Sequence, residues 1–115
     1  YNLLKFDYFV LNYYCKKTYE KYSPKTFDIM FEIEKKIGRR ISLDALAQEN
    51  LGIRKRIDGS KMPELWRSGN HKAVTEHCKE DIEITRKLYY LGKNKNKLRY
   101  FDKESERIKE LKVDW

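Results

Sequence analysis

Two side chains that could do chemistry, His77 and Asp81, stand four residues apart in the segment 71–91. Apolar residues recur in this segment at the spacing of an amphipathic helix, which predicts a helix that stops at Gly92. Residues four apart share one face of a helix, so the imidazole and the carboxylate would be neighbours. Such a pair can bind a metal ion, but it is equally common as a histidine that is merely satisfied in a core.

Asp81 is predicted to lie near the centre of the buried face of this helix. At about 100° per residue, the predicted face comprises Val74, His77, Cys78, Asp81, Ile82, Thr85, Leu88 and Tyr89. Burying an unpaired carboxylate costs several kcal/mol, so Asp81 should be ion-paired, hydrogen-bonded, protonated or bound to a cation. The helical pattern alone favours an ion pair with an Arg or Lys, or a cap on a neighbouring helix, over a metal site.

A second carboxylate, Asp7, stands at the start of a predicted helix over residues 6–17. A carboxylate at a helix N-terminus accepts hydrogen bonds from free backbone N–H groups and interacts favourably with the helix dipole. Taken alone, Asp7 is therefore interpreted as a helix cap.

Basic side chains gather in a predicted loop over residues 53–69. Arg54, Lys55, Arg56 and Lys61 could bind backbone phosphates of nucleic acid without reading sequence. A solvated loop explains the same residues equally well.

The composition predicts one small folded domain. The chain has 115 residues, a formal net charge of +8 and 14% aromatic residues, which argues against disorder and favours a polyanionic partner. The two cysteines, Cys15 and Cys78, form neither a zinc motif nor a disulfide framework. With no apolar run long enough to span a membrane and no signal peptide, the expected location is the cytoplasm and no membrane partner is expected.

The remaining elements are predicted from caps and periodicity. A second helix opens at residues 26–28 and closes at Gly38, and a third covers residues 43–51 between Ser42 and Gly52. Pro63 begins a helical turn, and residues 98–101 and 107–113 form a C-terminal β-hairpin. We expect these elements to position the chemistry-bearing side chains.

Several segments, taken in order, resemble the DEDD superfamily of 3′ to 5′ exonucleases. The opening segment, from Asn2 to Asp7, has the Asn, three residues, aromatic and Asp pattern of the second exonuclease motif. Further likeness is found in the segments TFDI (26–29), ISLDALA (41–47), LG (51–52), HCKEDIEIT (77–85) and VDW (113–115). The closest likeness is to ribonuclease H-like exonuclease domains that occur alone or linked to helicases.

This resemblance implies an α/β ribonuclease H-like fold, of which residues 1–115 would be the C-terminal portion: mostly the helical part and a β-hairpin, with the N-terminal sheet strands missing. It implies hydrolysis of phosphodiester bonds in DNA or RNA by two Mg²⁺ or Mn²⁺ ions, which carboxylate oxygens bind well. Asp7 and Asp81 would be metal ligands, and Asn2 would join the basic loop in binding nucleic acid.

The chain departs from the family pattern in two ways. Members of one branch carry Tyr four residues before the last aspartate and members of the other carry His five before it, whereas His77 stands four before Asp81. An imidazole there could still position or deprotonate the attacking water.

The second departure concerns the first motif, an Asp-x-Glu, which should lie upstream of Asn2. The chain by itself is therefore expected to be inactive. Either the missing part is on another polypeptide, or the chain is a truncated product that packs against itself or a second copy. The expected protein partners are therefore a helicase, the missing N-terminal part of the domain, or a second copy in a homodimer.

Three functions remain open. The first is a metal-dependent exonuclease, and the second is a non-catalytic nucleic-acid-binding or interaction module, which fits the +8 charge. The third is a purely structural helical domain, which would require Asp81 to pair with an Arg or Lys.

Overall fold

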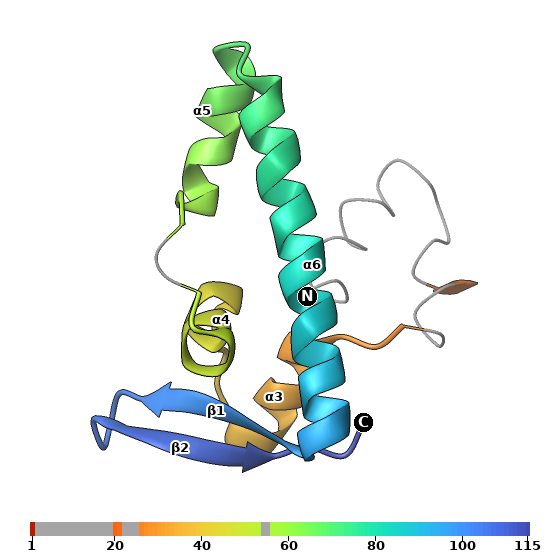
Figure 1. Cartoon of the computed structure of the whole chain (residues 1–115), viewed down its shortest axis with the longest axis vertical. Helices are drawn as coiled ribbons and strands as arrows, with labels where there is room; N and C mark the ends of the chain where they lie inside the picture. Colours follow the sequence, from red (N-terminus) through yellow and green to blue (C-terminus); the bar gives the residue numbers. More distant parts are fainter. Residues whose placement is uncertain (2–19, 22–25, 54–55) are drawn as a thin grey trace. The chain divides into compact units, whose positions relative to one another are not determined.

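The computed structural model describes residues 1, 20–21, 26–53 and 56–115. The chain divides into two compact units, Tyr1–Ser42 and Leu43–Trp115, and each is described by itself (Figure 1). The predicted helix over residues 6–17 lies outside the described residues.

In the first unit, helix α3 (Ile29–Ile37) has the boundaries that its capping residues predict. Asp28 has extended backbone angles and its carboxylate accepts a hydrogen bond from the N–H of Phe31 at 3.4 Å. Gly38 ends the helix in the left-handed conformation, at φ 76°, and donates its N–H to the carbonyl of Glu34. This cap suits glycine because a Cβ disfavours positive φ.

The side chain of Tyr1 packs within the same unit. Its hydroxyl donates a hydrogen bond to the carbonyl of Ile41. Burial, together with the negative charge of Asp28, raises the pKa of Tyr1 above its ordinary value of 10.0. The phenol is therefore held in its protonated, hydrogen-bond-donating form.

The second unit is built on α6 (His71–Lys95), a helix of 25 residues. Its C-terminal half packs against α4 (Leu43–Leu51) and strand β1 (Lys97–Asp102), and its N-terminal half packs against α5 (Met62–Arg67). Figure 1 shows these partners at opposite ends of α6. The buried core of the unit lies around the C-terminal half of α6. It consists of Leu46, Ala47, Ile84, Leu88, Leu98 and Val113.

The predicted stop of α6 at Gly92 is wrong, because the helix continues to Lys95 and is capped by Asn96 at φ 56°. Gly92 is buried, and a Cβ placed there would lie 2.7 Å from the indole of Trp115. That indole also donates its Nε1–H to the carbonyl of Tyr89 at 3.0 Å. Glycine is needed here for close side-chain approach and does not mark a helix end.

The predicted buried face of α6 is also partly wrong. Ile82 is 70% exposed and Cys78 is exposed. Ile84, which the prediction left out, is buried together with Leu88. Asp81 is half-buried, with 40% of its side chain exposed, so it lies at the margin of the packed face and not near its centre.

Helix α4 is predicted correctly, and the structure explains the polar Asn50 on its apolar side. The amide nitrogen of Asn50 donates to the carbonyls of Leu46 and Arg99, each at 2.8 Å. Its amide oxygen accepts the N–H of Arg99 at 2.7 Å. The side chain therefore binds both backbone polar groups of Arg99, as a neighbouring strand would.

Between α4 and α6 the chain forms the 3-10 turn η3 (Gly59–Lys61) and then α5, where Pro63 stands in the first turn as predicted. Asp58 caps η3 by accepting the N–H of Ser60 at 2.9 Å. These short elements begin at Gly59, shortly after Arg56, and make up much of the described part of the predicted basic loop.

The predicted C-terminal hairpin is confirmed. Strand β1 pairs in antiparallel fashion with β2 (Arg107–Lys112), from Lys97 opposite Lys112 to Asp102 opposite Arg107. Buried Asp102 stabilises the turn. Its carboxylate accepts a hydrogen bond from the hydroxyl of Ser105 at 2.9 Å and forms an ion pair with Lys109 at 2.6 Å. The described residues are thus mostly helical with a two-stranded C-terminal sheet, as expected for part of an α/β domain.

Candidate active site

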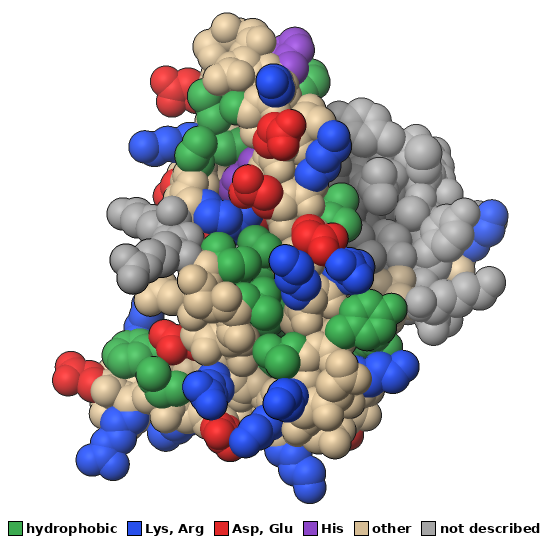
Figure 2. Space-filling model, in the orientation of Figure 1, with side chains coloured by type: hydrophobic (Ala, Val, Ile, Leu, Met, Phe, Trp, Pro, Cys, Tyr) green, Lys and Arg blue, Asp and Glu red, His purple; other side chains and the backbone are tan. Residues whose placement is uncertain are grey.

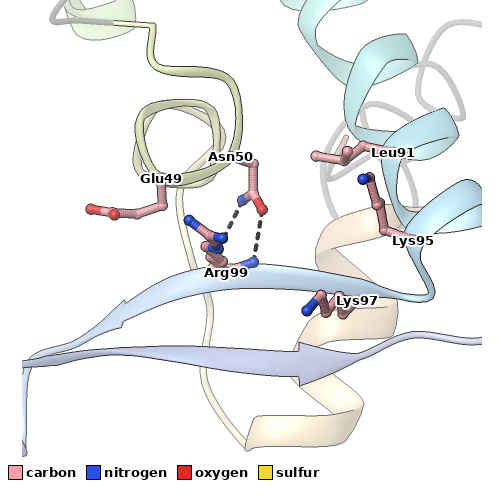
Figure 3. Close-up of a pocket in the computed structure, with 6 residues that line it drawn as sticks. All are labelled: Glu49, Asn50, Leu91, Lys95, Lys97 and Arg99. Carbon is pink, nitrogen blue, oxygen red and sulfur yellow. Dashed lines mark hydrogen bonds between the residues drawn. The ribbon is translucent and has the colours of Figure 1, made fainter.

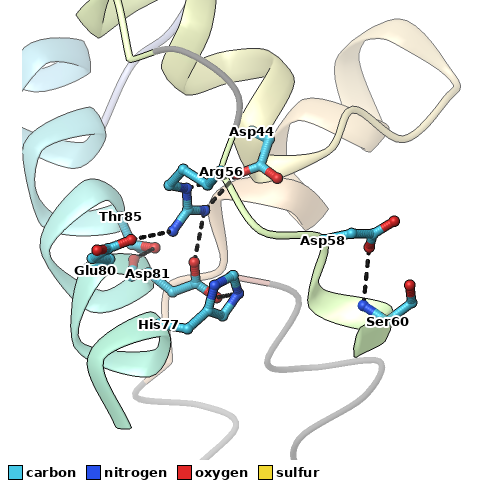
Figure 4. Close-up of polar contacts among 8 residues, drawn as sticks. All are labelled: Asp44, Arg56, Asp58, Ser60, His77, Glu80, Asp81 and Thr85. Atoms are coloured by element: carbon cyan, nitrogen blue, oxygen red, sulfur yellow. Dashed lines mark hydrogen bonds and ion pairs between the residues drawn. The ribbon is translucent and has the colours of Figure 1, made fainter. Parts of the chain in front are cut away.

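The predicted site residue Asp81 lies in a charged cluster centred on Arg56 (Figure 4). The guanidinium Nη2 of Arg56 is 2.8 Å from Asp81 Oδ1 and 2.5 Å from Asp44 Oδ1. Its Nη1 reaches Glu80 Oε2 at 3.4 Å, and its Nε donates to Asp44 Oδ1 at 3.1 Å. One cation from the loop thereby joins carboxylates of α4 and α6.

The charges in this cluster do not balance. Three carboxylates, of Asp44, Glu80 and Asp81, face the single guanidinium of Arg56. The Arg56 side chain is only 12% exposed. Its burial lowers the pKa, but the hydrogen bonds to Asp44 and the negative charges of Asp44 and Asp81 outweigh burial and raise the pKa of Arg56 overall. Among the described residues the cluster has surplus negative charge, within a chain whose net charge is +8.

One oxygen of Asp81 lacks a directed hydrogen-bond donor. Asp81 Oδ1 is buried and no described residue donates to it with hydrogen-bonding geometry. It nevertheless lies within ion-pair distance of Arg56 Nη2. We interpret the contact as charge attraction without a well-aligned hydrogen bond, so no described residue uses the hydrogen-bonding capacity of that oxygen.

His77 stands beside Asp81 as the helical spacing predicts. Its Nε2 lies 3.5 Å from Asp81 Oδ2, and only 12% of its side chain is exposed. On its other side the ring approaches η3, since a Cβ built on Gly59 would lie 3.8 Å from Nε2. The imidazole is therefore held between α6 and η3, with Asp81 as its acidic neighbour.

The other predicted site residues are placed differently. Lys61 is exposed at the end of η3, where it can meet solvent or a ligand. Arg56, predicted to contact nucleic acid, is engaged by the carboxylates of the cluster. Asn2, Asp7, Arg54 and Lys55 lie outside the described residues.

The cluster fits a metal ion only in part. Carboxylate oxygens are the ligands that Mg²⁺ and Mn²⁺ prefer, and buried Asp81 Oδ1 lacks a directed donor. Within the described ranges, however, no group of three or more His, Cys, Asp or Glu side chains could hold an ion. The guanidinium of Arg56 already supplies the positive charge beside Asp81. Asp81 therefore offers one carboxylate ligand, and a bound ion would need further ligands from other residues.

Sequence reasoning missed Asp44 and Glu80 as members of the cluster. Glu80 lies outside the predicted buried face and is exposed, and Asp44 is simply an acidic residue in the first turn of α4. The only sequence signal was that Asp81 required a positive partner. Nothing in local periodicity identifies which of the many basic residues that partner is.

Comparison with known families adds an independent finding. A family model described as the RNase H superfamily matches residues 1–92, most of the chain. No curated protein and no solved structure matches the chain. In the part of the chain that the structure describes, no helix is long and apolar enough to cross a membrane.

Proposed function

The chain belongs to the RNase H superfamily. We propose that it is part of a metal-dependent 3′ to 5′ exonuclease that hydrolyses phosphodiester bonds of DNA or RNA. The observation that carries this proposal is the buried Asp81 Oδ1, which lies in the matched segment beside His77 and has no directed donor among the described residues. The likeness to DEDD exonucleases supports the reaction type and the 3′ to 5′ polarity.

In this proposal, the residues of the cluster divide the work. Asp81, together with Asp7, would hold Mg²⁺ or Mn²⁺, and the bound ions supply water activation and neutralise charge on the phosphate. Arg56 is a positioning residue, because its contacts fix the Asp81 carboxylate from the side of α4. His77 would orient or accept a proton from water, since its Nε2 already faces the acidic site.

Asp81→Ala is the variant that tests the proposal. The assay uses the product of the whole reading frame, because the resemblance implies an acidic motif that precedes Asn2. Single-stranded DNA and RNA labelled at the 5′ end are incubated with Mn²⁺ or Mg²⁺. We expect stepwise shortening from the 3′ end, and a loss of rate of about 100-fold or more in Asp81→Ala.

Glu83→Ala is the matched control, because it removes an exposed carboxylate two residues away on the same helix. It should retain the wild-type rate. Hydrolysis that Asp81→Ala leaves unchanged would refute the assignment of Asp81. Cleavage within the strand, or from the 5′ end, would refute the polarity while leaving the hydrolysis itself established.

The ion pair between Arg56 and Asp81 is the contact that a purely structural helical domain requires, and it also favours a second function, a non-catalytic nucleic-acid-binding module. If Arg56 permanently replaces a metal ion, the protein binds nucleic acid without cutting it. This alternative predicts salt-dependent binding, no hydrolysis and no Mn²⁺-induced rise in melting temperature. The exonuclease predicts a Mn²⁺-induced rise that Asp81→Ala abolishes.

A further inference from the structure

A pocket outside the acidic cluster opens where α4, α6 and β1 meet (Figure 3). It has a volume of about 310 Å³ and is lined by Glu49, Asn50, Leu91, Lys95, Lys97 and Arg99. The charged residues of the lining are therefore three cations and one carboxylate. Lys95, Lys97 and Arg99 follow residues 1–92, so the family match does not extend to them.

The cations of this pocket are available for a ligand. Neither Lys95 nor Arg99 forms an ion pair with any residue that the structure describes. Lys97 contacts Glu110 at 3.2 Å, but both side chains are about half exposed, and such surface pairs contribute little stability. Lys97 can thus exchange its carboxylate partner for a phosphate at small cost.

The backbone that carries Arg99 is fixed independently of its side chain. Asn50 binds both the N–H and the carbonyl of Arg99, as Figure 3 shows. The guanidinium is therefore presented from a rigid strand position, which reduces the entropy lost when it binds an anion. It also means that Arg99 can be substituted without removing the hydrogen bonds that hold β1.

The pocket continues onto the outer face of the hairpin, which is both basic and aromatic. Lys97, Arg99 and Phe101 alternate with the buried positions of β1 and so share the exposed face. Phe101 and Ile108 are cross-strand partners and are 44% and 59% exposed. Figure 2 shows Lys and Arg side chains gathered over this end of the unit.

From this arrangement we propose that the pocket and the outer hairpin face bind single-stranded nucleic acid, with phosphates held by Lys95, Lys97 and Arg99 and a base stacked on Phe101. The combination of cations and an exposed aromatic ring suits a strand whose bases are unpaired. Lys95 follows Asp81 on α6 by about 21 Å along the helix axis. The inference rests on the proposed function, because it gives the nuclease a second, remote contact with its substrate.

Binding of a fluorescein-labelled thymidine 12-mer, followed by fluorescence anisotropy across a salt series, tests the proposal. Lys97→Gln/Arg99→Gln removes two positive charges from the pocket, whereas Lys103→Gln/Arg107→Gln removes two from exposed positions at the hairpin turn. We expect the pocket variant to weaken binding at least about 10-fold and to reduce the slope of log Kd against log salt by about 1.4. The turn variant should leave both nearly unchanged.

Phe101→Ala provides a second readout. Loss of base stacking should weaken binding by about 5-fold or more while leaving the salt slope unchanged. Circular dichroism of each variant verifies folding. Equal weakening by the pocket and turn variants, or no binding of the 12-mer, would overturn the inference.

Hydrolysis is measured separately with Asp81→Ala, so the two proposals fail independently. Loss of cleavage in Asp81→Ala together with unaltered binding in the pocket variant would refute the hairpin site and leave the exonuclease intact. Salt-dependent binding that the pocket variant weakens, without any cleavage, would support the hairpin site and refute the exonuclease.

Discussion

Arg56 is the residue on which the charged cluster depends, because it is the cation that three carboxylates share. Replacing it with Ala would remove the positive charge that the described residues place beside buried Asp81 Oδ1 and would leave the Asp44 and Asp81 carboxylates to repel each other. We expect Arg56→Ala to lower the free energy of unfolding by about 1–3 kcal/mol. Urea denaturation of the variant and the wild type measures this difference.

A double-mutant cycle separates the ion pair from general packing. Asp81→Ala should make the Arg56→Ala substitution less destabilising, with a coupling free energy of about 0.5–3 kcal/mol. Arg86→Ala is the control, since Arg86 pairs with exposed Glu83 at the surface of the same helix. It should change stability little, and an equal loss in Arg86→Ala would contradict a special role for Arg56.

At this scale the sequence predicted the need for a partner but not its identity. A carboxylate among apolar positions of a helix implied an ion pair or a bound cation, and the structure contains an ion pair with Arg56. Arg56 itself was interpreted as a nucleic-acid contact. A pairing between residues 56 and 81 depends on how the loop returns to α6, and neither helical periodicity nor composition reports such a long-range contact.

Gly92 determines how α6 meets the C-terminus. Alanine is usually about 1 kcal/mol better than glycine inside a helix, yet a Cβ at position 92 would lie 2.7 Å from the Trp115 indole. We expect Gly92→Ala to destabilise the protein by about 1–3 kcal/mol, because the indole or the helix must shift. Thermal unfolding followed by tryptophan fluorescence measures both the stability and the displaced ring.

Gly59→Ala is the matched control, since its Cβ would meet only His77 Nε2 at 3.8 Å, an ordinary contact. It should be nearly neutral. Combining Gly92→Ala with Trp115→Ala should remove most of the added cost of the alanine. If Gly92→Ala stabilises the protein, the close approach of Trp115 has been misjudged.

Among the elements, those with clear capping residues were predicted well. Asp28 and Gly38 mark both ends of α3, and Gly52 at φ 67° follows α4. The prediction for Gly92 is wrong because the sequence does not distinguish a glycine needed for close packing from one needed for positive φ. The exposed Ile82 and the buried Ile84 show a similar limit, because the packed face of a helix depends on where its neighbours lie.

For the whole molecule, the order of motifs was more informative than any physical pattern. The resemblance to ribonuclease H-like domains agrees with the family match over residues 1–92. Composition alone gave only a basic, aromatic-rich chain. The hairpin was predicted as an element, but its pocket was not, since the pocket arises from three elements that meet only in the folded unit.

The contacts of Asn50 have a consequence for self-association. An exposed strand edge is a template on which another chain can add a strand, and proteins commonly protect such edges. By binding both backbone groups of Arg99, the Asn50 amide occupies a position that an incoming strand would need. The side chain therefore acts as a guard against intermolecular sheet formation.

Asn50→Ala should make the protein aggregate at concentrations at which the wild type does not, as measured by light scattering and by amyloid-dye fluorescence. Gln48→Ala is the control, because Gln48 is exposed on the same helix. Aggregation of both variants alike would point to loss of helix stability instead. The Asn50 amide would thus keep the hairpin available to a nucleic-acid strand by preventing its edge from adding strands of other molecules.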